Sequence, residues 1–264
     1  MTALVQAVKN ILRQFKRKLE GSLPRNLNVS SPIVQIYLGG EYETRYSLVN
    51  FPSLLSPMTA YTCIYDIALY SKNGSCVGKR SISLEPFQSY EVRPSEIFGE
   101  NLPDLGMLTA KIRSASPLVF SDKHLGKITP HIYALYSDKE RRSLVLVHPQ
   151  TTLVNKASKN QEWRSGVLLD SNKIKRVIAI QINPSKQSAK STLFLYREGE
   201  ERKWLGEMNG EILPMGARKI EWDIAKTGIS KGNFSIGANT LLSPNAKPII
   251  LTYFDNETFT GMHA

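Results

Sequence analysis

Two histidines lie at matching places in the sequence, and the residues around them are of the types that build a polar-ligand or metal site. Each histidine follows the aspartate of a Tyr-x-Asp triplet by eight or ten residues. Phenol, carboxylate and imidazole groups together can hydrogen-bond a small ligand or hold a metal ion. The alternative is that each aspartate starts a hairpin turn and each histidine only ends a strand. The candidate ligands, which would line a site between two β-sandwiches, are His148, His263, Tyr136, Tyr253, Asp138 and Asp255.

Other signals for metal binding or catalysis are weak. No two of the four histidines have the His-x-His or His-x-x-x-His spacing of a local metal clasp, so any cofactor stays unknown. Residues 74–78 match a nucleophile elbow with Cys76 at the nucleophile position, but an elbow needs a strand before it and a helix after it. Asn73-Gly74 is a hairpin signal, and residues 79–84 alternate like a return strand. Whether the chain is an enzyme is left open, and a non-catalytic role is favoured.

The net charge of +11 comes from two segments of the chain. Residues 1–20 hold five positive charges and one negative charge, and residues 139–190 hold eleven positive and three negative charges. Local basic segments favour contact with an acidic protein, a lipid head group or another polyanion, and the neutral remainder argues against nucleic acid as the partner. The cations expected to contact an anionic surface are Lys9, Arg13, Lys16, Arg17, Lys18, Arg141, Arg142, Lys173, Lys175 and Arg176.

Residues 1–24 are predicted to contain a basic amphipathic helix. Apolar residues recur at steps of three and four from Leu4 to Leu19, and cations occupy the opposite side. Gly21 and Pro24 provide a stop signal. The apolar side of such a helix can pack on the same protein, lie on an anionic membrane surface, or dock on a partner or a second copy. The sequence leaves these three alternatives open.

From residue 28 onward the sequence predicts an all-β fold. Short runs rich in Val, Ile, Tyr, Phe and Thr alternate with Gly, Pro and Asn, as in antiparallel β-sandwiches. The pattern occurs twice, which predicts two related tandem sandwiches over residues 28–152 and 160–264, behind the N-terminal helix. The alternative is one large sandwich whose hairpins share turn chemistry. The recurring landmarks, at offsets of 126 to 128 residues, are Tyr70 with Tyr196, Pro86 with Pro214, and Gly106 with Gly232.

The order of these landmarks also resembles a known group. A strand that ends in a Tyr-containing turn, a Pro-led strand, and a Gly-initiated strand followed by Ser-Pro are similar to the sensory rhodopsin transducer-like β-sandwich proteins. The resemblance implies a small cytoplasmic antiparallel sandwich that oligomerises and acts by binding, and it assigns no functional residue. The residues that carry it are Tyr70, Pro86, Gly106 and Pro117, and then Tyr196, Pro214, Gly232 and Pro244.

Two hypotheses of different classes follow. The first is a non-catalytic binding or scaffold protein that engages a protein partner, a second copy or an anionic surface through its basic segments and sheet edges. The alternative is a small-ligand or metal-binding protein, or an enzyme, with its site between the sandwiches at His148 and His263. The apolar content of 41% is too high for disorder. With two cysteines, no 18-residue apolar window and no secretory signal, we expect a cytoplasmic protein that could contact an anionic membrane only peripherally.

Overall fold

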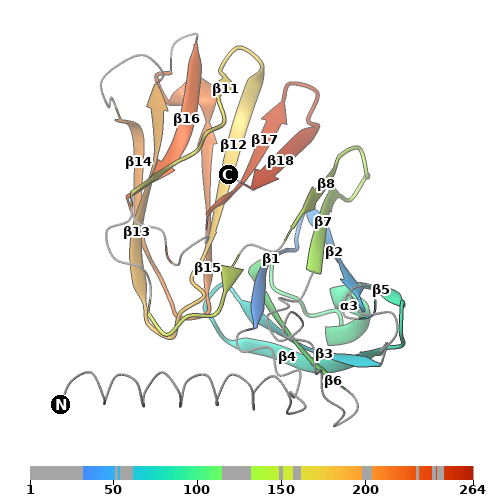
Figure 1. Cartoon of the computed structure of the whole chain (residues 1–264). Helices are drawn as coiled ribbons and strands as arrows, with labels where there is room; N and C mark the ends of the chain where they lie inside the picture. The colour runs from blue at the N-terminus through green and yellow to red at the C-terminus, as the bar shows by residue number, and fades with distance from the viewer. Residues whose placement is uncertain are drawn as a thin grey trace, which may run out of the picture.

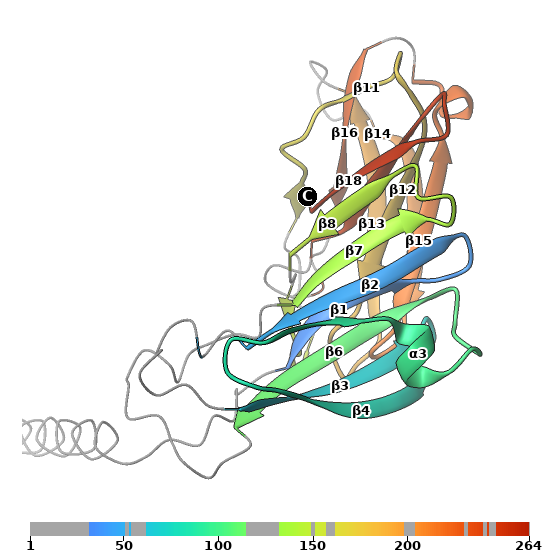
Figure 2. The same cartoon turned by 90° about the vertical axis from the view of Figure 1, so that its right-hand side faces the viewer.

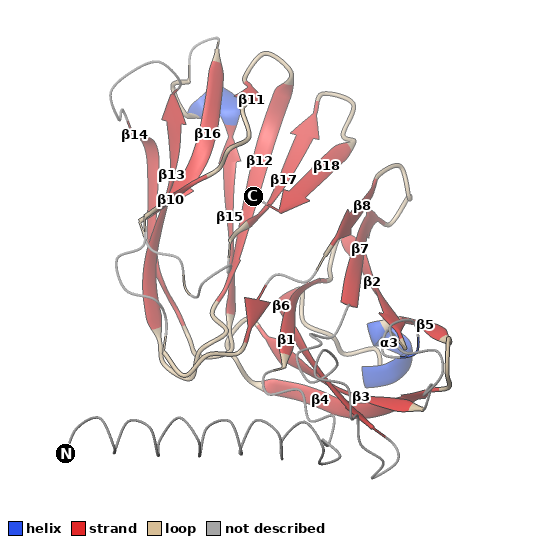
Figure 3. Cartoon of the chain, viewed as in Figure 1, coloured by secondary structure: helices blue, strands red, loops and turns tan. Residues whose placement is uncertain are grey.

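The computed structural model describes residues 32–50, 53, 62–114, 132–148, 151–156, 162–197, 204–229, 232–239, 242 and 247–263. The predicted N-terminal helix, with its five cations, and the landmarks Pro117 and Pro244 lie outside these residues. The regular structure of the described part is nearly all strand, as Figure 3 shows, so the predicted all-β fold is confirmed. None of the described helices is long and apolar enough to cross a membrane.

Residues 33–152 form the first half of the molecule, which consists of two antiparallel sheets with their apolar faces together (Figure 1). One sheet has the order β4-β3-β6-β1-β9 and the other β5-β2-β7-β8. The elements are β1 (Ile33–Leu38), β2 (Tyr42–Val49), β3 (Cys63–Ser71), β4 (Cys76–Leu84), β5 (Ser89–Val92), α3 (Pro94–Phe98), β6 (Leu105–Ser114), β7 (Ile132–Asp138), β8 (Leu144–Val147) and β9 (Thr151–Thr152).

Residues 163–263 form the second half, and its strands pair in the same order. One sheet has the order β10-β16-β13-β14, with β11 also on β16, and the other β15-β12-β17-β18. Thus β12 to β18 take the places of β2 to β8. The elements are β10 (Trp163–Arg164), β11 (Leu169–Asp170), β12 (Ile174–Ile182), β13 (Ala189–Arg197), β14 (Trp204–Ile212), β15 (Ala217–Asp223), the 3-10 helix η3 (Ile224–Lys226), β16 (Asn233–Ala238), β17 (Ile249–Phe254) and β18 (Phe259–His263).

A buried asparagine marks the same corner in both halves. Asn50 follows β2 and donates through Nδ2 to the carbonyl oxygens of Leu84 and Glu85, at 3.1 and 3.0 Å. Asn183 follows β12 and donates in the same way to Ile212 and Leu213, at 2.9 and 3.1 Å. Both asparagines are fully buried, so these bonds satisfy carbonyls that water cannot reach. These hydrogen bonds hold the end of β2 against the end of β4, and the end of β12 against the end of β14.

The turns that follow β4 and β14 also match. Phe87 after Pro86 has φ of 63°, and Met215 after Pro214 has φ of 58°. A non-glycine residue in this region is uncommon, so its occurrence at both places supports the alignment of the two turns. The third landmark does not align: Tyr70 pairs with Met107, whereas Tyr196 pairs with Ser235. The register therefore matches Gly106 with Phe234, and the predicted match with Gly232 is two residues off.

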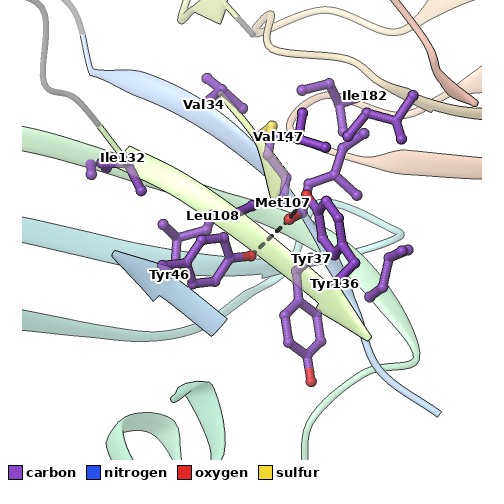
Figure 4. Packing of buried hydrophobic residues seen from close by; sticks show 14 of the residues in the cluster. Val34, Tyr37, Tyr46, Met107, Leu108, Ile132, Tyr136, Val147 and Ile182 are labelled. Atoms are coloured by element: carbon purple, nitrogen blue, oxygen red, sulfur yellow. Dashed lines mark hydrogen bonds between the residues drawn. The ribbon is translucent and has the colours of Figure 1, made fainter. Parts of the chain in front are cut away.

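Within the β15-β12-β17-β18 sheet, β12 and β17 are buried on both faces along most of their length. Val177 and Ala179 of β12 pack in the core of the second half, whereas Ile178, Ile180 and Ile182 belong to the core cluster of the first half. Figure 4 draws Ile182 with Val34, Met107, Tyr136 and Val147 of that cluster. The core of the first half therefore extends onto the outer face of this sheet, in addition to the separate core of the second half. This shared contact positions the residues between the two halves.

A second contact joins the two halves at the β3–β4 hairpin. The backbone N–H of Ala217 donates to the carbonyl oxygen of Lys72 at 3.0 Å. Gly74 has φ of +80°, and a Cβ there would lie 1.9 Å from the carbonyl oxygen of Pro214. The glycine is thus required by the turn and by the neighbouring backbone. The Gly74–Gly78 segment is a hairpin, as predicted, and Cys76 is exposed on its return strand.

Candidate binding cleft between the two halves

A hollow of about 290 Å³ opens where the turns of the first half meet β12 and β17 of the second half. The first half contributes the β1–β2 and β7–β8 turns, and the second contributes β12, β17 and the β17–β18 turn. Figure 2 shows β2, β7, β8 and β18 following one another along one side of the molecule. We call this hollow the junction cleft, and its lining residues are Glu41, Tyr42, Asp138, Lys139, Glu140, Arg142, Arg176, Tyr253 and Glu257.

Two tyrosines, one from each half, meet in the cleft. The hydroxyl of Tyr42 contacts the hydroxyl of Tyr253, and both side chains are about 5% exposed. Both rings pack against Phe259, at centroid distances of 5.9 and 5.2 Å. Burial is the largest cause of the raised pKa of Tyr42, and its hydrogen bond to Tyr253 adds to the shift. The pKa values of both phenols are raised, so both are neutral at pH 7, and either hydroxyl can be the donor in this pair.

Arg176 covers the ring of Tyr253 and places a positive charge in the wall of the cleft. Its guanidinium carbon lies 3.9 Å from the centroid of the Tyr253 ring, within the range of a cation–π contact. Its Nη1 atom donates to Glu221 at 3.1 Å. Although partial burial opposes the charged form, the Glu221 carboxylate raises the pKa of Arg176 above its ordinary value. The wall thus presents a fixed positive charge on an aromatic face.

Asp138 lines the cleft, and one of its carboxylate oxygens accepts no hydrogen bond from any residue that the structure describes. Its Oδ1 accepts from the backbone N–H of Arg142 at 2.9 Å. Its Oδ2 is buried and accepts no hydrogen bond, and its ion-pair contact with Arg142 Nε is long, at 3.9 Å. Arg142 Nε lies closer to Glu140, at 3.0 Å. A buried carboxylate oxygen with its acceptor capacity unused is a place where a ligand donor can bind.

Two equivalent hairpin turns present these side chains. Arg141 N–H donates to Asp138 O at 3.0 Å, and Glu257 N–H donates to Phe254 O at 3.1 Å. Arg141 has φ of 57° and Glu257 has φ of 61°, so both turns have the same left-handed residue. The hairpin interpretation of Asp138 and Asp255 is therefore confirmed, and Asp138 also lines the cleft. Asp255 instead lines a separate hollow between Lys175 and Asp223.

Of the six residues expected to act as ligands, the structure brings two together. Asp138 and Tyr253 line the junction cleft, as expected for a site between the sandwiches. Tyr136 instead lies in the core, where its hydroxyl donates to Ile36 O at 2.8 Å. His148 follows β8 on the surface, and His263 ends β18 with its side chain outside the described part. No group of three or more His, Cys, Asp or Glu in the described residues is placed to hold a metal ion.

Tyr42, Glu41 and Glu257 line this site but were not predicted from the sequence. Tyr42 begins β2, whose buried and half-buried residues alternate along the strand, so it looks like any other residue of the buried face. Its role arises only because Tyr253 arrives from a strand more than 200 residues away. A signal was present in the basic segment: Arg142 and Arg176 were expected to contact an anionic surface, and both line the cleft.

Five of the ten described cations of the basic 139–190 segment lie in ion pairs with acidic residues. All five were predicted to contact an anionic surface, and each has a carboxylate within 4 Å. Folding therefore places a carboxylate next to each of these five cations, from the same segment or from another strand. Exposed pairs of this kind are weak, so the surface prediction stays a prediction. The pairs are Arg141 with Glu43, Arg142 with Glu140, Lys173 with Asp170, Lys175 with Glu257, and Arg176 with Glu221.

No protein-family model and no curated protein match the chain. Among solved structures, the chain is similar to the M60 catalytic domain with the CBM51-1 and CBM51-2 domains of Clostridium perfringens ZmpB, at 9% identity over 82% of this chain and 34% of that one, with a TM-score of 0.21. Bacteroides uniformis β-glucuronidase 2 matches at 10% identity over 91% of this chain and 28% of that one, with a TM-score of 0.21. The chain thus spans about a third of each of these proteins, and likeness at this level assigns no function.

Proposed function

We propose that this chain is a binding protein that takes a small polar ligand in the junction cleft between two related β-sandwiches. The observation that carries the proposal is the unused Oδ2 of Asp138 beside the Tyr42–Tyr253 pair. The recurrence of the strand order supports an origin by internal duplication, with the cleft formed where the two copies meet. In this proposal the site uses Asp138 and Tyr253 from the expected set, together with Tyr42 and Arg176.

The chemistry of the cleft specifies the ligand class. Asp138 Oδ2 requires a donor, and an amine or a hydroxyl can supply it. The Tyr42–Tyr253 hydroxyl pair can supply a hydrogen-bond donor or acceptor to a ligand, and Arg176 adds positive charge above the Tyr253 ring. A volume of about 290 Å³ suits a molecule the size of an amino acid or a monosaccharide. We therefore propose a ligand that carries an amine or hydroxyl at one end and an acceptor at the other, with an amino sugar or a zwitterion as the simplest cases.

Titration calorimetry with a defined probe set tests this proposal. The probes are glucose, glucosamine, arginine and glycine betaine, which separates ligands with a donor from the quaternary ammonium, which has none. We expect glucosamine or arginine to bind and glycine betaine not to bind. Asp138→Asn replaces one carboxylate oxygen with an amide donor and should weaken binding by about tenfold or more, the equivalent of about 1.4 kcal/mol. Tyr253→Phe should weaken it by a smaller factor.

Asp255→Asn is the matched control, because Asp255 lies in the corresponding hairpin of the second half but lines a different hollow. We expect this variant to bind the probe as the unmodified chain does. Equal loss in Asp138→Asn and Asp255→Asn would contradict the proposal, because the effect would then be one of general charge. Absence of saturable binding by glucose, glucosamine and arginine alike would contradict it as well.

A further inference from the structure

Two free sheet edges of opposite charge lie on the two halves. β4 ends the β4-β3-β6-β1-β9 sheet and β14 ends the β10-β16-β13-β14 sheet, and among the described strands they pair only with β3 and β13, respectively. Figure 1 shows β14 at the border of its sheet, and Figure 2 shows β4 at the border of its own. Each strand has nine residues, and the two occupy equivalent places in the two halves. A border strand keeps backbone N–H and C=O groups that can pair with another strand.

The charges of these two edges are complementary. β4 contains Lys79 and Arg80 and no acidic residue, whereas β14 contains Glu207 and Glu211 and no basic residue. All four side chains are exposed. None of the four forms an ion pair with a residue that the structure describes. The two edges are therefore distinguished by the opposite signs of their charge, although Glu211 lies opposite Lys190 of β13 in the sheet.

We propose that β4 of one copy adds to β14 of a second copy, so that the chain assembles head to tail through strand addition. Lys79 lies on the outer face of its sheet, as do Glu207 and Glu211 on theirs, because their pairing partners alternate with the core residues of β3 and β13. An antiparallel alignment of the full strands therefore sets Lys79 opposite Asn209, between the two glutamates. Opposite charges on neighbouring strands stabilise such a pairing, and like charges oppose it.

The competing explanation is that Lys79 and Arg80 only keep β4 from pairing, since charged residues commonly protect edge strands. That explanation assigns no role to the acidic character of β14. The assembly proposal uses both edges and predicts a specific partner for each. It also predicts that β4 does not pair with β4, and β14 does not pair with β14, because like charges would then face each other. The contact is heterologous, so it continues into an open chain or closes into a ring.

Charge reversal with mixing tests the proposal. Sedimentation velocity of the full chain at low ionic strength should show assembly that increases with concentration. The pair Lys79→Glu with Arg80→Glu should weaken association at least tenfold, and the pair Glu207→Lys with Glu211→Lys should do the same. Mixing the two reversed proteins should restore association, because the acidic edges of one protein then face the basic edges of the other. Lys186→Glu, an exposed change in the β12–β13 loop, is the matched control and should leave association unchanged.

Circular dichroism confirms that each variant keeps its strands, and rescue by mixing excludes misfolding as the cause. A single species of one-chain mass at all concentrations would overturn the proposal. So would mixed variants that stay apart, or a Lys186→Glu variant that loses association to the same extent. The junction cleft does not enter this test, because none of its residues is changed. Failure here would leave the proposed ligand site standing, and failure of the calorimetric test would leave this assembly standing.

Discussion

The two halves of the molecule share a strand order but use one equivalent sheet differently. In the first half, β2 alternates between buried and half-buried residues, because one face of the β5-β2-β7-β8 sheet lies toward solvent. In the second half, β12 is buried almost throughout, because the outer face of the β15-β12-β17-β18 sheet packs on the first half. The outer face of this sheet is thus an interface in the second half and a surface in the first, and the junction cleft lies at the border of that interface.

A register difference of one residue separates the two tyrosines expected to be equivalent. With Asn50 matched to Asn183, Thr44 on β2 matches Val177 on β12. Thr44 pairs with Tyr136 and Val177 pairs with Thr252, so Tyr253 falls one position beyond the place of Tyr136. Because side chains alternate between faces, Tyr136 points into the first core and Tyr253 points toward the junction. Tyr136 thus packs in the core of the first half, whereas Tyr253 lines the junction cleft.

High pH should destabilise the protein by more than any single substitution considered. Burial raises the pKa of four tyrosines of the first half well above their ordinary value of 10.0, and these are Tyr42, Tyr46, Tyr65 and Tyr136. The folded state therefore keeps them protonated, and its stability is complete below pH 10 and falls as the pH rises above 10. Four such groups together cost about 5.6 kcal/mol one pH unit above 10, at about 1.4 kcal/mol each.

Denaturant unfolding at a series of pH values above 9 measures this loss, with tyrosinate absorbance as a second signal. Amide hydrogen exchange should increase first in β2, β3 and β7, since the first half carries these tyrosines. A free energy of unfolding that stays constant to about pH 11 would contradict the assignment of these buried tyrosines.

The next largest effect should distinguish the outer faces of the two equivalent strands. Ile180 on β12 is fully buried, and the matching position on β2 is Ser47, which is half-buried. Ile180→Ala should lower the free energy of unfolding by about 2–5 kcal/mol, because it opens a cavity between the halves. Ser47→Ala should change it by less than about 0.5 kcal/mol. Denaturant unfolding measures both, and similar losses for the two variants would refute the shared core.

Removing the corner asparagines should give a smaller and graded effect. Asn183→Ala leaves Ile212 O and Leu213 O without their donor and should lower the free energy of unfolding by about 2–3 kcal/mol. Asn50→Ala should lower it by about 1–2 kcal/mol, because Asn50 Oδ1 accepts from Ser53 N–H at a long 3.3 Å, whereas Asn183 Oδ1 accepts from both Ser185 N–H and Ser185 Oγ and its Nδ2 also donates to Gln187 O. Exposed Asn172→Ala is the control for the chemical change. Thermal unfolding of the three variants checks the order, and a corner variant as stable as the control would remove the corner from the account.

The smallest expected effect separates the two tyrosine positions. Tyr253→Phe leaves the buried Tyr42 hydroxyl without its partner and should lower the free energy of unfolding by about 1–2 kcal/mol. Tyr136→Phe should lower it by less than about 1 kcal/mol, because Tyr46 still donates to Ile36 O at 2.8 Å. The reverse order in denaturant unfolding would show that the hydroxyl contact between the halves contributes nothing.

The sequence predicted the strands and most of their turns, because local alternation and turn residues specify them. It also placed Asp138 and Tyr253 in a common site between the halves. It could not predict that the β12 sheet is covered twice, since its continuous apolar pattern is also found in ordinary buried strands. The roles of Tyr42 and Arg176 depend on contacts across more than 75 residues, which no local pattern contains. The resemblance to transducer-like sandwiches stays a prediction.

Hydrogen–deuterium exchange of the full chain, with and without the probe that binds best in calorimetry, tests the junction cleft most directly. If the ligand binds in the junction cleft, the bound probe should slow exchange in both halves at once. The affected residues should be 41–42 and 138–142 in the first half and 176, 253 and 257 in the second. The Asp255→Asn chain should show the same protection, and the Asp138→Asn chain should lose it. Protection confined to one half, or protection that persists in Asp138→Asn, would contradict a binding site built between the two sandwiches.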